Sequence, residues 1–490
     1  MIKIKTKFSL SAFCLIILLP LLLAANNIAI SNPGLTAQVT ADKYVMVRFN
    51  LSWDNSWRAS SGPGNWDAAW VFVKYRVSGG AWQHATLHAS GHSGGTGTSA
   101  TVTPAADGTG AFIYRSGVGS GAFAISGAQL RWDYGVNGVA DNATVDIRVF
   151  AIEMVYVPQG AFALGSGGTE SGAFYLYPTT TNTYLVSSEA EITVGTGAGN
   201  LYYPSGSNYG DQTGPVPAAF PKGYNAFYCM KYEISQQQYA DFLNSLTATQ
   251  ASSRYSSASS GYRYGISVAS GVYNTTNPYV ACNWMNWDDG AAYSDWAGLR
   301  PLTEMEFEKA CRGTVTPVAD EYAWGTTTIA GLAYTLANPG ASNEGIATNY
   351  SSDAGNASYG NTDGSIDGPI RVGIFAANSL NSGRITAGVS YYGIMELSGN
   401  LWERPVTIGN AAGRGFTGLH GDGALDASGF ANVSSWPGTD AVGSGFRGGT
   451  WAGGTDILCV SDRHLAAHYY AIRSNTYGNG FRAARSGPAL

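Results

Sequence analysis

The stretch NPYVACNWMNWDDGAAYSDWAGLRPLTEMEFEKACRG, residues 277–313, contains two helix signatures in succession. Asn286 can cap a helix whose first turn carries two aspartates, where negative charge meets the positive end of the helix dipole. Thr303 and Glu306 have the spacing of a capping box at the start of a second helix. We therefore predict two paired helices in this part of the chain.

A third helix signature precedes this stretch, and little regular structure follows it. In EISQQQYADFLNSL, residues 233–246, Ser235 and Gln238 again have capping-box spacing, and the apolar residues that follow share one face. After Gly313 the chain has loops and short strand-like runs without helical periodicity. From Met154 onward the sequence therefore predicts an α+β fold with unusually little regular structure.

Residues 26–153 have a different texture, because short alternating runs are separated by glycine-rich turns. The clearest runs are VMVRFNLSW (45–53), AAWVFVKYRV (68–77) and ATVDIRVFAIEMVYV (143–157). Such runs between turn clusters are typical of an all-β sandwich. We predict a β-sandwich-like domain over residues 26–153 that supports or presents a second domain over residues 154–490.

His84, His88 and His92 form the one constellation of the N-terminal region that could carry chemistry. Their even spacing would place them on one face of an extended strand, where three imidazoles can hold a metal ion. The turn-rich sequence after His88 interrupts such a strand. Exposed histidines are therefore the better interpretation.

The composition excludes one class of function and indicates export. Charged residues make up 12% of the 490 residues and the net charge is −6, whereas a general nucleic-acid binder carries a basic stripe. Residues 1–25 have the lysine-rich start, the apolar run and the small-residue cleavage point of a signal peptide. An uncleaved membrane anchor is the alternative, although the apolar run is short for one. We expect a secreted or surface-displayed protein whose mature chain has no transmembrane segment.

Four cysteines remain after the signal peptide, namely Cys229, Cys282, Cys311 and Cys459. In an exported protein they can form disulfides, and four cysteines allow three complete pairings that a sequence does not separate. Their wide spacing excludes a compact zinc motif.

Six segments of the chain, in this order, resemble the formylglycine-generating enzyme family, also called the sulfatase-modifying factor domain. They are MVYVPQGAFALGS (154–166), FYCMKYEISQQQYADFL (227–243), the opening stretch (277–313), YAWG (322–325), YYGIMELSGNLWE (391–403), and FRGGTW with GFRAAR (446–451 and 480–485). The resemblance implies a variant of the C-type lectin fold with a low content of regular structure.

Catalytic members of this family oxidise a cysteine of a target sulfatase to formylglycine, with copper held by two thiolates. In this resemblance Cys459 falls on the second thiolate position, whereas Gly454 falls on the first. A single thiolate binds Cu(I) far more weakly, so we expect a non-catalytic protein. A copper-dependent formylglycine-generating oxidoreductase with Cys459 as its catalytic residue is the alternative. Without catalysis, Cys459 is a small buried residue, half of a disulfide, or a retained reactive thiol.

The turn GNLWE, residues 399–403, is better preserved. In the family the corresponding segment helps to bind a structural calcium ion, which takes several oxygen ligands and tolerates irregular loops. The resemblance implies side-chain ligands from Asn400 and Glu403, and carbonyl ligands from Gly399 and Leu401. The alternative is that Glu403 only accepts hydrogen bonds from loop amides. Arg404 departs from the family pattern, because an aromatic residue usually follows the glutamate.

The irregular segment between FRGGTW and GFRAAR, residues 452–479, is rich in residues suited to binding. Rigid scaffolds with irregular loops commonly present specificity in this way. The candidate ligand contacts are Asp462, Arg463, His464, His468, Tyr469, Tyr470, Arg473 and Asn475. The alternative is that many of these side chains pack the loop itself.

The same segment resembles the variable region of proteins diversified by retroelements. In such regions mutation at the adenines of asparagine codons cannot produce Lys, Glu, Gln, Met or Trp, and none of these residues occurs between Ala452 and Arg485. From these observations we expect a secreted, two-domain protein that binds a protein or glycan ligand through its C-terminal loops. The alternatives are the oxidoreductase and a structural component of a surface complex. The sequence leaves the oligomeric state open.

Overall fold

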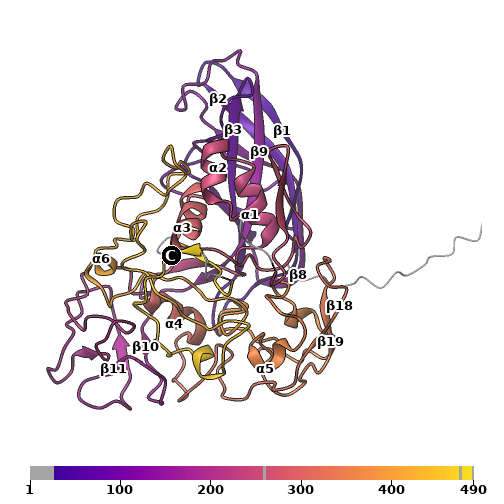
Figure 1. Cartoon of the computed structure of the whole chain (residues 1–490). Coiled ribbons are helices and arrows are strands. Elements are labelled where there is room, and N and C mark those ends of the chain that lie inside the picture. The colour runs from indigo at the N-terminus through magenta and orange to yellow at the C-terminus, as the bar shows by residue number, and fades with distance from the viewer. Residues whose placement is uncertain (1–26, 258–260, 474–476, 488–490) are drawn as a thin grey trace, which may run out of the picture.

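A computed structural model of the chain describes residues 27–257, 261–473 and 477–487. The long strands of the N-terminal region lie in the upper part of the molecule in Figure 1, and a loop-rich part lies below them. The first sheet contains β1 (Ala29–Val39), β2 (Tyr44–Arg58), β5 (Thr96–Gly97) and β8 (Gly119–Trp132). The second sheet contains β3 (Asp67–Val77), β4 (Gln83–His84), β6 (Ala100–Pro104), β7 (Ala111–Arg115), β9 (Val145–Val157), β14 (Phe227–Met230), β17 (Arg300–Pro301) and β20 (Ala483–Ser486).

The remaining elements are short. Two-stranded sheets pair β10 (Phe162–Leu164) with β12 (Tyr184–Val186), β11 (Tyr175–Leu176) with β13 (Leu201–Tyr202), β15 (Ile266–Ala269) with β16 (Val272–Thr275), and β18 (Thr335–Ala337) with β19 (Gly345–Thr348). The helices are α1 (Gln236–Leu243), α2 (Ala248–Arg254), α3 (Trp287–Trp296), α4 (Glu304–Arg312), α5 (Gly360–Asp363) and α6 (Ala411–Arg414), with 3₁₀ turns η1 (Phe375–Ala377) and η2 (Asp456–Leu458).

The two sheets pack face to face in the N-terminal region. The first has the strand order β1-β2-β8-β5, and β2 pairs with β8 along most of its length. Alternate residues of β2, such as Val47, Phe49 and Leu51, are buried in one apolar cluster with Val71 and Val73 of β3. The predicted β-rich N-terminal region is therefore confirmed, and the alternation in the sequence marks the face that enters the core.

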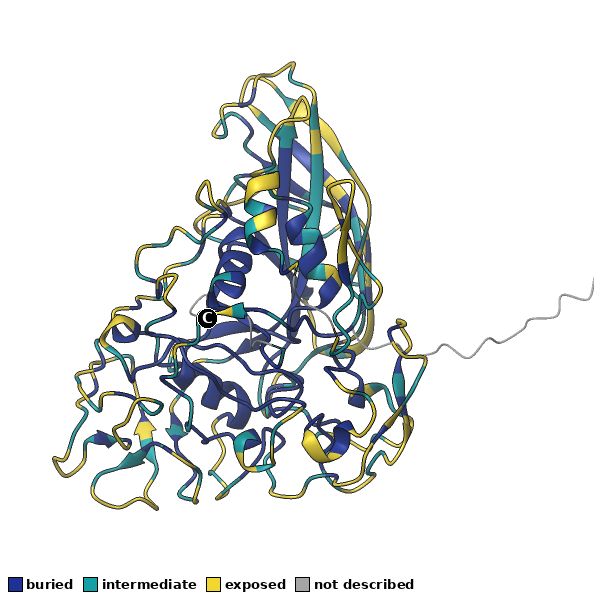
Figure 2. Ribbon diagram, viewed as in Figure 1, coloured by how far each residue is buried: buried dark blue, intermediate teal, exposed yellow. Residues whose placement is uncertain are grey.

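Strand β3 is buried on both faces, because helices cover the side of the second sheet that faces away from the first. The ring of Phe72 meets Trp296 of α3 edge-on at 5.1 Å between centroids, and Trp70 donates its indole N–H to the carbonyl oxygen of Ala297 at 2.8 Å. A strand covered on both faces needs a continuous apolar run, which AAWVFV supplies. Figure 2 shows α3 and the neighbouring strands as a buried layer.

Strand β9 carries the second sheet from the N-terminal region into the C-terminal region. Its residues 145–155 pair with β3, and its residues 154–157 pair with β14, beyond which lie β20 and β17. The boundary predicted between residues 153 and 154 falls inside this strand. One apolar cluster contains Trp70, Met154 and Phe481 together. The residues on the two sides of that boundary therefore share a sheet and a core.

The three predicted helix starts are confirmed. Ser235, Asn286 and Thr303 each accept a hydrogen bond from the main-chain N–H three residues later, and each of those later side chains closes the capping box. The same device opens α2 at Thr247, a helix that the sequence analysis missed. Within the described ranges, no helix combines the length and the apolar character needed to cross a bilayer.

The three N-terminal histidines are half-buried rather than exposed, and they bind main-chain groups. His84 lies in β4 with its Nε2 2.6 Å from the carbonyl oxygen of Thr109, and burial lowers its pKa to about 3. His92 Nε2 lies 2.7 Å from the carbonyl oxygen of His88. In the described part of the chain, no group of three or more His, Cys, Asp or Glu side chains is arranged to hold a metal ion.

Candidate functional site

The irregular C-terminal segment begins and ends against the turn at residues 399–403. The main-chain N–H of Trp451 donates to the carbonyl oxygen of Asn400 at 2.8 Å, and the N–H of Trp402 donates to that of Gly478 at 2.9 Å. Between these two points, the described residues form mostly turns and include the 3₁₀ turn η2. The segment is thus a long loop fixed at both ends.

Cys459 follows η2 directly and is buried in a cluster with Tyr322, Trp324 and Tyr359. Its Sγ donates to the carbonyl oxygen of Asp320 at 3.5 Å. Burial raises the pKa of this thiol well above its ordinary value, and nearby carboxylates raise it further. Because the thiolate is the nucleophile and the metal ligand, the structure holds Cys459 in its unreactive form at neutral pH.

The other cysteines test two further expectations for Cys459, namely a disulfide and a copper site with a second thiolate. Cys229, Cys282, Cys311 and Cys459 are all buried and free, so none of the possible disulfides forms among them. Cys459 shares its apolar cluster with no other cysteine, and Gly454 is exposed on the loop before η2. These residues do not fit a copper site of two thiolates. The interpretation of Cys459 as a small buried residue matches its surroundings.

Two predicted ligand contacts, Asp462 and Arg463, lie in the interior. Arg463 is fully buried, and its Nε donates to Glu304 Oε2 at 2.7 Å while its guanidinium lies 3.9 Å from the centroid of the Phe174 ring. Asp462 is 5% exposed and accepts a hydrogen bond from His464 Nδ1 at 2.6 Å. The prediction that these two side chains contact a ligand is therefore not supported, because both are engaged in holding the loop.

Arg463 belongs to a buried network that the sequence analysis missed. Arg447 bridges Glu304 and Glu308 of α4 at 3.1 and 2.7 Å, and Arg312 reaches Glu308 at 3.2 Å. Burial alone would raise the pKa of Glu304, but the charges of Arg463 and Arg447 lower it below its ordinary value. The available signal was the spacing of Glu304 and Glu308, which places two carboxylates on one face of the predicted helix.

Arg473 also anchors the loop. Its Nε donates to Asp289 Oδ2 at 2.8 Å, and its Nη2 donates to the carbonyl oxygen of Ser253 at 2.8 Å. Asp289 is the third residue of α3, so this ion pair fixes the loop to the start of that helix. Asn475, another predicted contact, lies outside the described residues.

Four predicted contacts remain at the surface and form what we name the histidine–tyrosine surface: His464, His468, Tyr469 and Tyr470. Tyr469 is 54% exposed, whereas the other three are half-buried. The rings of His468 and Tyr470 stack with centroids 5.9 Å apart and planes 12° apart. Burial and the neighbouring Arg404 and His464 lower the pKa of His468, which favours its neutral imidazole at pH 7.

Buried aromatic residues support the histidine–tyrosine surface from beneath. Trp402 lies 5.7 Å from His464 and Phe446 lies 6.0 Å from His468, between ring centroids. The guanidinium of Arg404 covers Phe446 at 4.1 Å and donates to the carbonyl oxygen of Tyr470 at 3.1 Å. Arg404, which replaces the aromatic residue of the family pattern, therefore packs like an aromatic side chain while also holding the loop.

Within the turn at residues 399–403, Asn400 and Glu403 accept hydrogen bonds from other parts of the protein. Asn400 Oδ1 accepts a hydrogen bond from the N–H of Ile370 at 2.9 Å, and its carbonyl oxygen accepts the N–H of Trp451. Glu403 Oε1 accepts one from Arg482 Nε at 2.7 Å, whereas the buried Glu403 Oε2 has no hydrogen-bond partner. Calcium needs six to eight oxygens, and within the described residues no group of three or more His, Cys, Asp or Glu side chains gathers at this turn to supply them. Calcium binding through Gly399, Asn400, Leu401 and Glu403 stays a prediction.

Comparison with known proteins agrees with the six segments quoted from the sequence. A search of curated proteins gave no match. The family model of the sulfatase-modifying factor enzyme 1-like domain matches residues 146–486, from the start of β9 to the end of β20. That match covers more than half of the chain and includes α4, the turn at residues 399–403 and the C-terminal loop. The chain therefore belongs to the sulfatase-modifying factor enzyme 1-like domain family.

Proposed function

We propose that this chain is a non-catalytic member of its family, secreted or displayed at a surface, which binds a protein or glycan ligand through the histidine–tyrosine surface. The observation that carries the proposal is that one loop contains both side chains that anchor it and side chains that it exposes. Arg463 and Arg473 are paired with carboxylates, while Tyr469 and Ile472 expose 54% and 63% of their area. A loop anchored by buried charges can expose apolar side chains without collapsing onto them.

The chemistry of the exposed side chains suits recognition rather than catalysis. Tyrosine and histidine combine an aromatic face with a hydrogen-bonding edge, and they lose little conformational entropy when a partner covers them. A neutral His468 can both donate and accept a hydrogen bond, as a sugar hydroxyl or a peptide group requires. The stacked pair His468–Tyr470 and the supporting Trp402 give this surface a fixed shape.

The proposal includes the finer features that the resemblance implies. The region after residue 153 is proposed to be a C-type lectin-like variant, in which loops rather than strands present the binding residues. The rival function, formylglycine formation by Cys459, requires a thiolate, and the burial of this thiol opposes that state. A structural role in a surface complex is the other rival.

The binding proposal is tested with the purified mature chain on a printed glycan array and against a yeast-displayed peptide library. We expect at least one probe class to bind the chain. The binding should be lost in the double variant His468→Ala/Tyr469→Ala and retained in Tyr202→Ala, which removes an aromatic side chain from β13 instead. Binding that survives the double variant would contradict the proposed surface.

A second measurement addresses catalysis directly. The chain is loaded with Cu(I) and incubated with a Cys-x-Pro-x-Arg peptide, and the peptide mass is followed. A mass change at the peptide cysteine that is absent in Cys459→Ser would overturn the non-catalytic proposal. An unchanged mass with folded protein supports it.

A further inference from the structure

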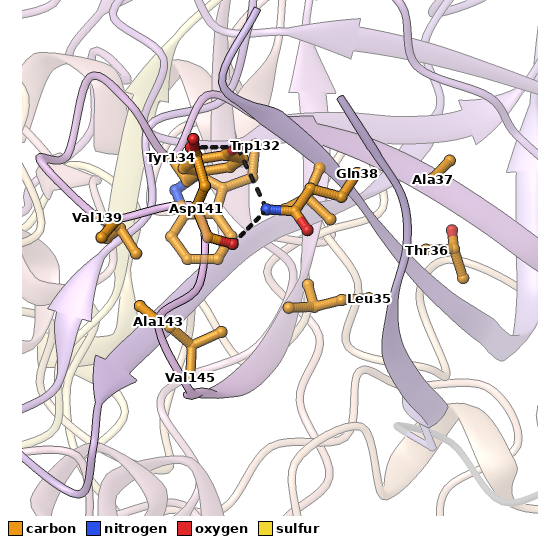
Figure 3. Close-up of a pocket in the computed structure, with 12 residues that line it drawn as sticks. Leu35, Thr36, Ala37, Gln38, Trp132, Tyr134, Val139, Asp141, Ala143 and Val145 are labelled. Atoms are coloured by element: carbon orange, nitrogen blue, oxygen red, sulfur yellow. Dashed lines mark hydrogen bonds between the residues drawn. The ribbon is translucent and has the colours of Figure 1, made fainter. Parts of the chain in front are cut away.

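A cavity of about 260 Å³ opens at one end of the β-sandwich, outside the residues that match the family model. Its walls come from β1, β2, the start of β9 and the loop that follows β8 (Figure 3). The larger apolar residues of the lining, together with Ala143, are Leu35, Val45, Trp132, Val139 and Val145. An engineered protein cavity of about 150 Å³ accepts benzene, so this space is large enough for a six-membered ring or a short alkyl chain.

One edge of the cavity is polar. The side-chain amide of Gln38 donates to Tyr134 Oη at 3.3 Å and to the carbonyl oxygen of Asp141 at 2.8 Å, and Tyr134 in turn donates its hydroxyl proton to Asp141 Oδ1 at 2.9 Å. Figure 3 shows these three side chains gathered above Leu35, Ala143 and Val145. A polar edge over an apolar floor fixes the orientation of a ligand that enters.

The hydrogen bonds at this edge decide which ligand chemistry it can accept. The two amide hydrogens of Gln38 and the hydroxyl hydrogen of Tyr134 are already donated within the trio. The uncommitted side-chain atoms of this trio are acceptors, namely Gln38 Oε1 and Asp141 Oδ2. A ligand that binds to the trio must therefore bring the donors.

The charge at this edge narrows the choice further. Within the described residues, no salt bridge joins Asp141 to a basic side chain, and neither lysine nor arginine lines the cavity. A carboxylate without a basic partner at the mouth of an apolar space attracts a cation that can also donate hydrogen bonds. A primary ammonium meets both conditions.

We propose that this cavity binds a ligand with an apolar body that ends in a primary ammonium group. The apolar body lies against Leu35, Val139 and Val145, and the ammonium donates to Asp141 and Gln38. Two sources share this chemistry: a free small amine, and the side chain of a lysine in a partner protein. The site is independent of the histidine–tyrosine surface, so neither proposal depends on the other.

The test uses saturation-transfer NMR titrations of the full mature chain with three matched probes. They are 2-phenylethylamine, 2-phenylethanol, which replaces the ammonium by a neutral hydroxyl, and 3-phenylpropionate, which carries a negative charge. We expect the amine to bind about five-fold more tightly than the alcohol, as a half-exposed charge pair provides, and the acid not to bind. Nα-acetyl-lysine amide forms a fourth arm, and comparison of its affinity with that of the amine identifies the source.

Three variants make the test specific. Asp141→Asn should weaken the binding of the amine about five-fold and leave the binding of the alcohol unchanged. Asp42 is an exposed carboxylate outside the cavity, so Asp42→Asn should change neither affinity. Ala143→Phe fills the cavity and should abolish binding of both probes, with circular dichroism showing that it remains folded. The absence of amine binding to the unmodified chain would overturn the proposal. An amine affinity that survives Asp141→Asn or Ala143→Phe would overturn it equally.

Discussion

The β-sandwich and the loop-rich region after β14 bury their main chains by different means. In the sandwich, β2 pairs with β8 and β3 pairs with β9, and the space between the sheets is filled by apolar side chains. In the loop-rich region, arginine side chains reach into the interior and donate to loop carbonyl oxygens. Arg482 donates to the carbonyl oxygen of Met395 in a loop at 2.8 Å, and to that of Met230 at the end of β14 at 2.9 Å.

The same use of arginine recurs along the loop-rich region. Arg447 donates to the carbonyl oxygen of Val460 at 2.8 Å, and Arg463 donates to that of Gly172 at 3.0 Å. The largest fully buried side chains include tryptophans from the sandwich, Trp53, Trp70 and Trp132, and arginines after residue 299: Arg300, Arg312, Arg371, Arg404, Arg447, Arg463 and Arg482.

The difference shows how a chain with few charged residues can fold with little regular structure. A buried carbonyl oxygen needs a donor, which a strand or helix supplies from the main chain. Where the chain forms loops, the five N–H groups of a guanidinium supply several donors from one side chain. Neighbouring glutamates balance the charge of Arg447, Arg463 and Arg482, so that each of these arginines both pairs with a carboxylate and replaces main-chain hydrogen bonds.

The largest expected effect is the loss of one such arginine. Arg447→Met leaves Glu304 and Glu308 buried without their shared cation, and we expect the free energy of unfolding to fall by about 4 kcal/mol. Urea denaturation measures this change. The triple variant that also carries Glu304→Gln and Glu308→Gln should lose more, because it also leaves the buried Arg463 without its carboxylate partner. A cost for Arg447→Met close to zero would show that the network does not hold this region.

An apolar truncation in the sandwich should cost somewhat less. Leu51 is 1% exposed between the two sheets, and Leu51→Ala leaves a cavity there. We expect a loss of about 3 kcal/mol in the same urea experiment. This loss should not depend on pH between 5 and 8, since no group that titrates in this range contacts Leu51 in the apolar cluster. A strong pH dependence would break the proposed contrast between the two regions.

The sequence predicted the parts of this fold that depend on neighbours in the chain. Capping residues such as Ser235 and Thr303 predicted helix starts, and the alternation of apolar and polar residues predicted the strands of the sandwich. It did not predict that Arg463 is structural, because its partner Glu304 lies 159 residues away. Asp462 differs, because its carboxylate accepts a hydrogen bond from His464, only two residues along the chain, and its burial is not visible in the sequence. The half-buried His468 and the exposed Tyr469 stay predicted ligand contacts, and the structure leaves part of each side chain at the surface.

Glu396 provides a pH-dependent test of the buried charges. Burial raises the pKa of this carboxyl to about 7, although Arg482 opposes the shift. The folded protein therefore retains a proton that the unfolded chain releases near pH 4.5, and the resulting stability is lost as the pH rises through about 7. We expect Glu396→Gln, whose amide oxygen can still accept the N–H of Gly373, to gain about 2 kcal/mol relative to the unmodified protein between pH 5 and pH 8. If the difference in unfolding free energy between Glu396→Gln and the unmodified protein stayed constant across this range, Glu396 would not be the group that holds the proton.

The smallest expected effect on stability is at the histidine–tyrosine surface. Tyr469→Ala should change the free energy of unfolding by less than about 0.5 kcal/mol, because the side chain is mostly exposed. Arg463→Met, six residues earlier in the same loop, should show the large loss expected of the buried network. Urea denaturation of the two variants side by side measures the contrast. Similar losses would mean that Tyr469 packs the loop and is not available to a ligand.

Strand β9 has a consequence for how this protein can be produced and recombined. A fragment that begins at residue 154 would lose most of β9 and would uncover Tyr228 of β14, whose ring stacks on Phe112 of β7 at 3.7 Å between centroids. The exposed strand edge and aromatic face would make such a fragment prone to aggregate. We therefore expect that the region after residue 153 does not fold stably when it is separated from β9. Any transplant of it into another protein must carry a strand that takes the place of β9.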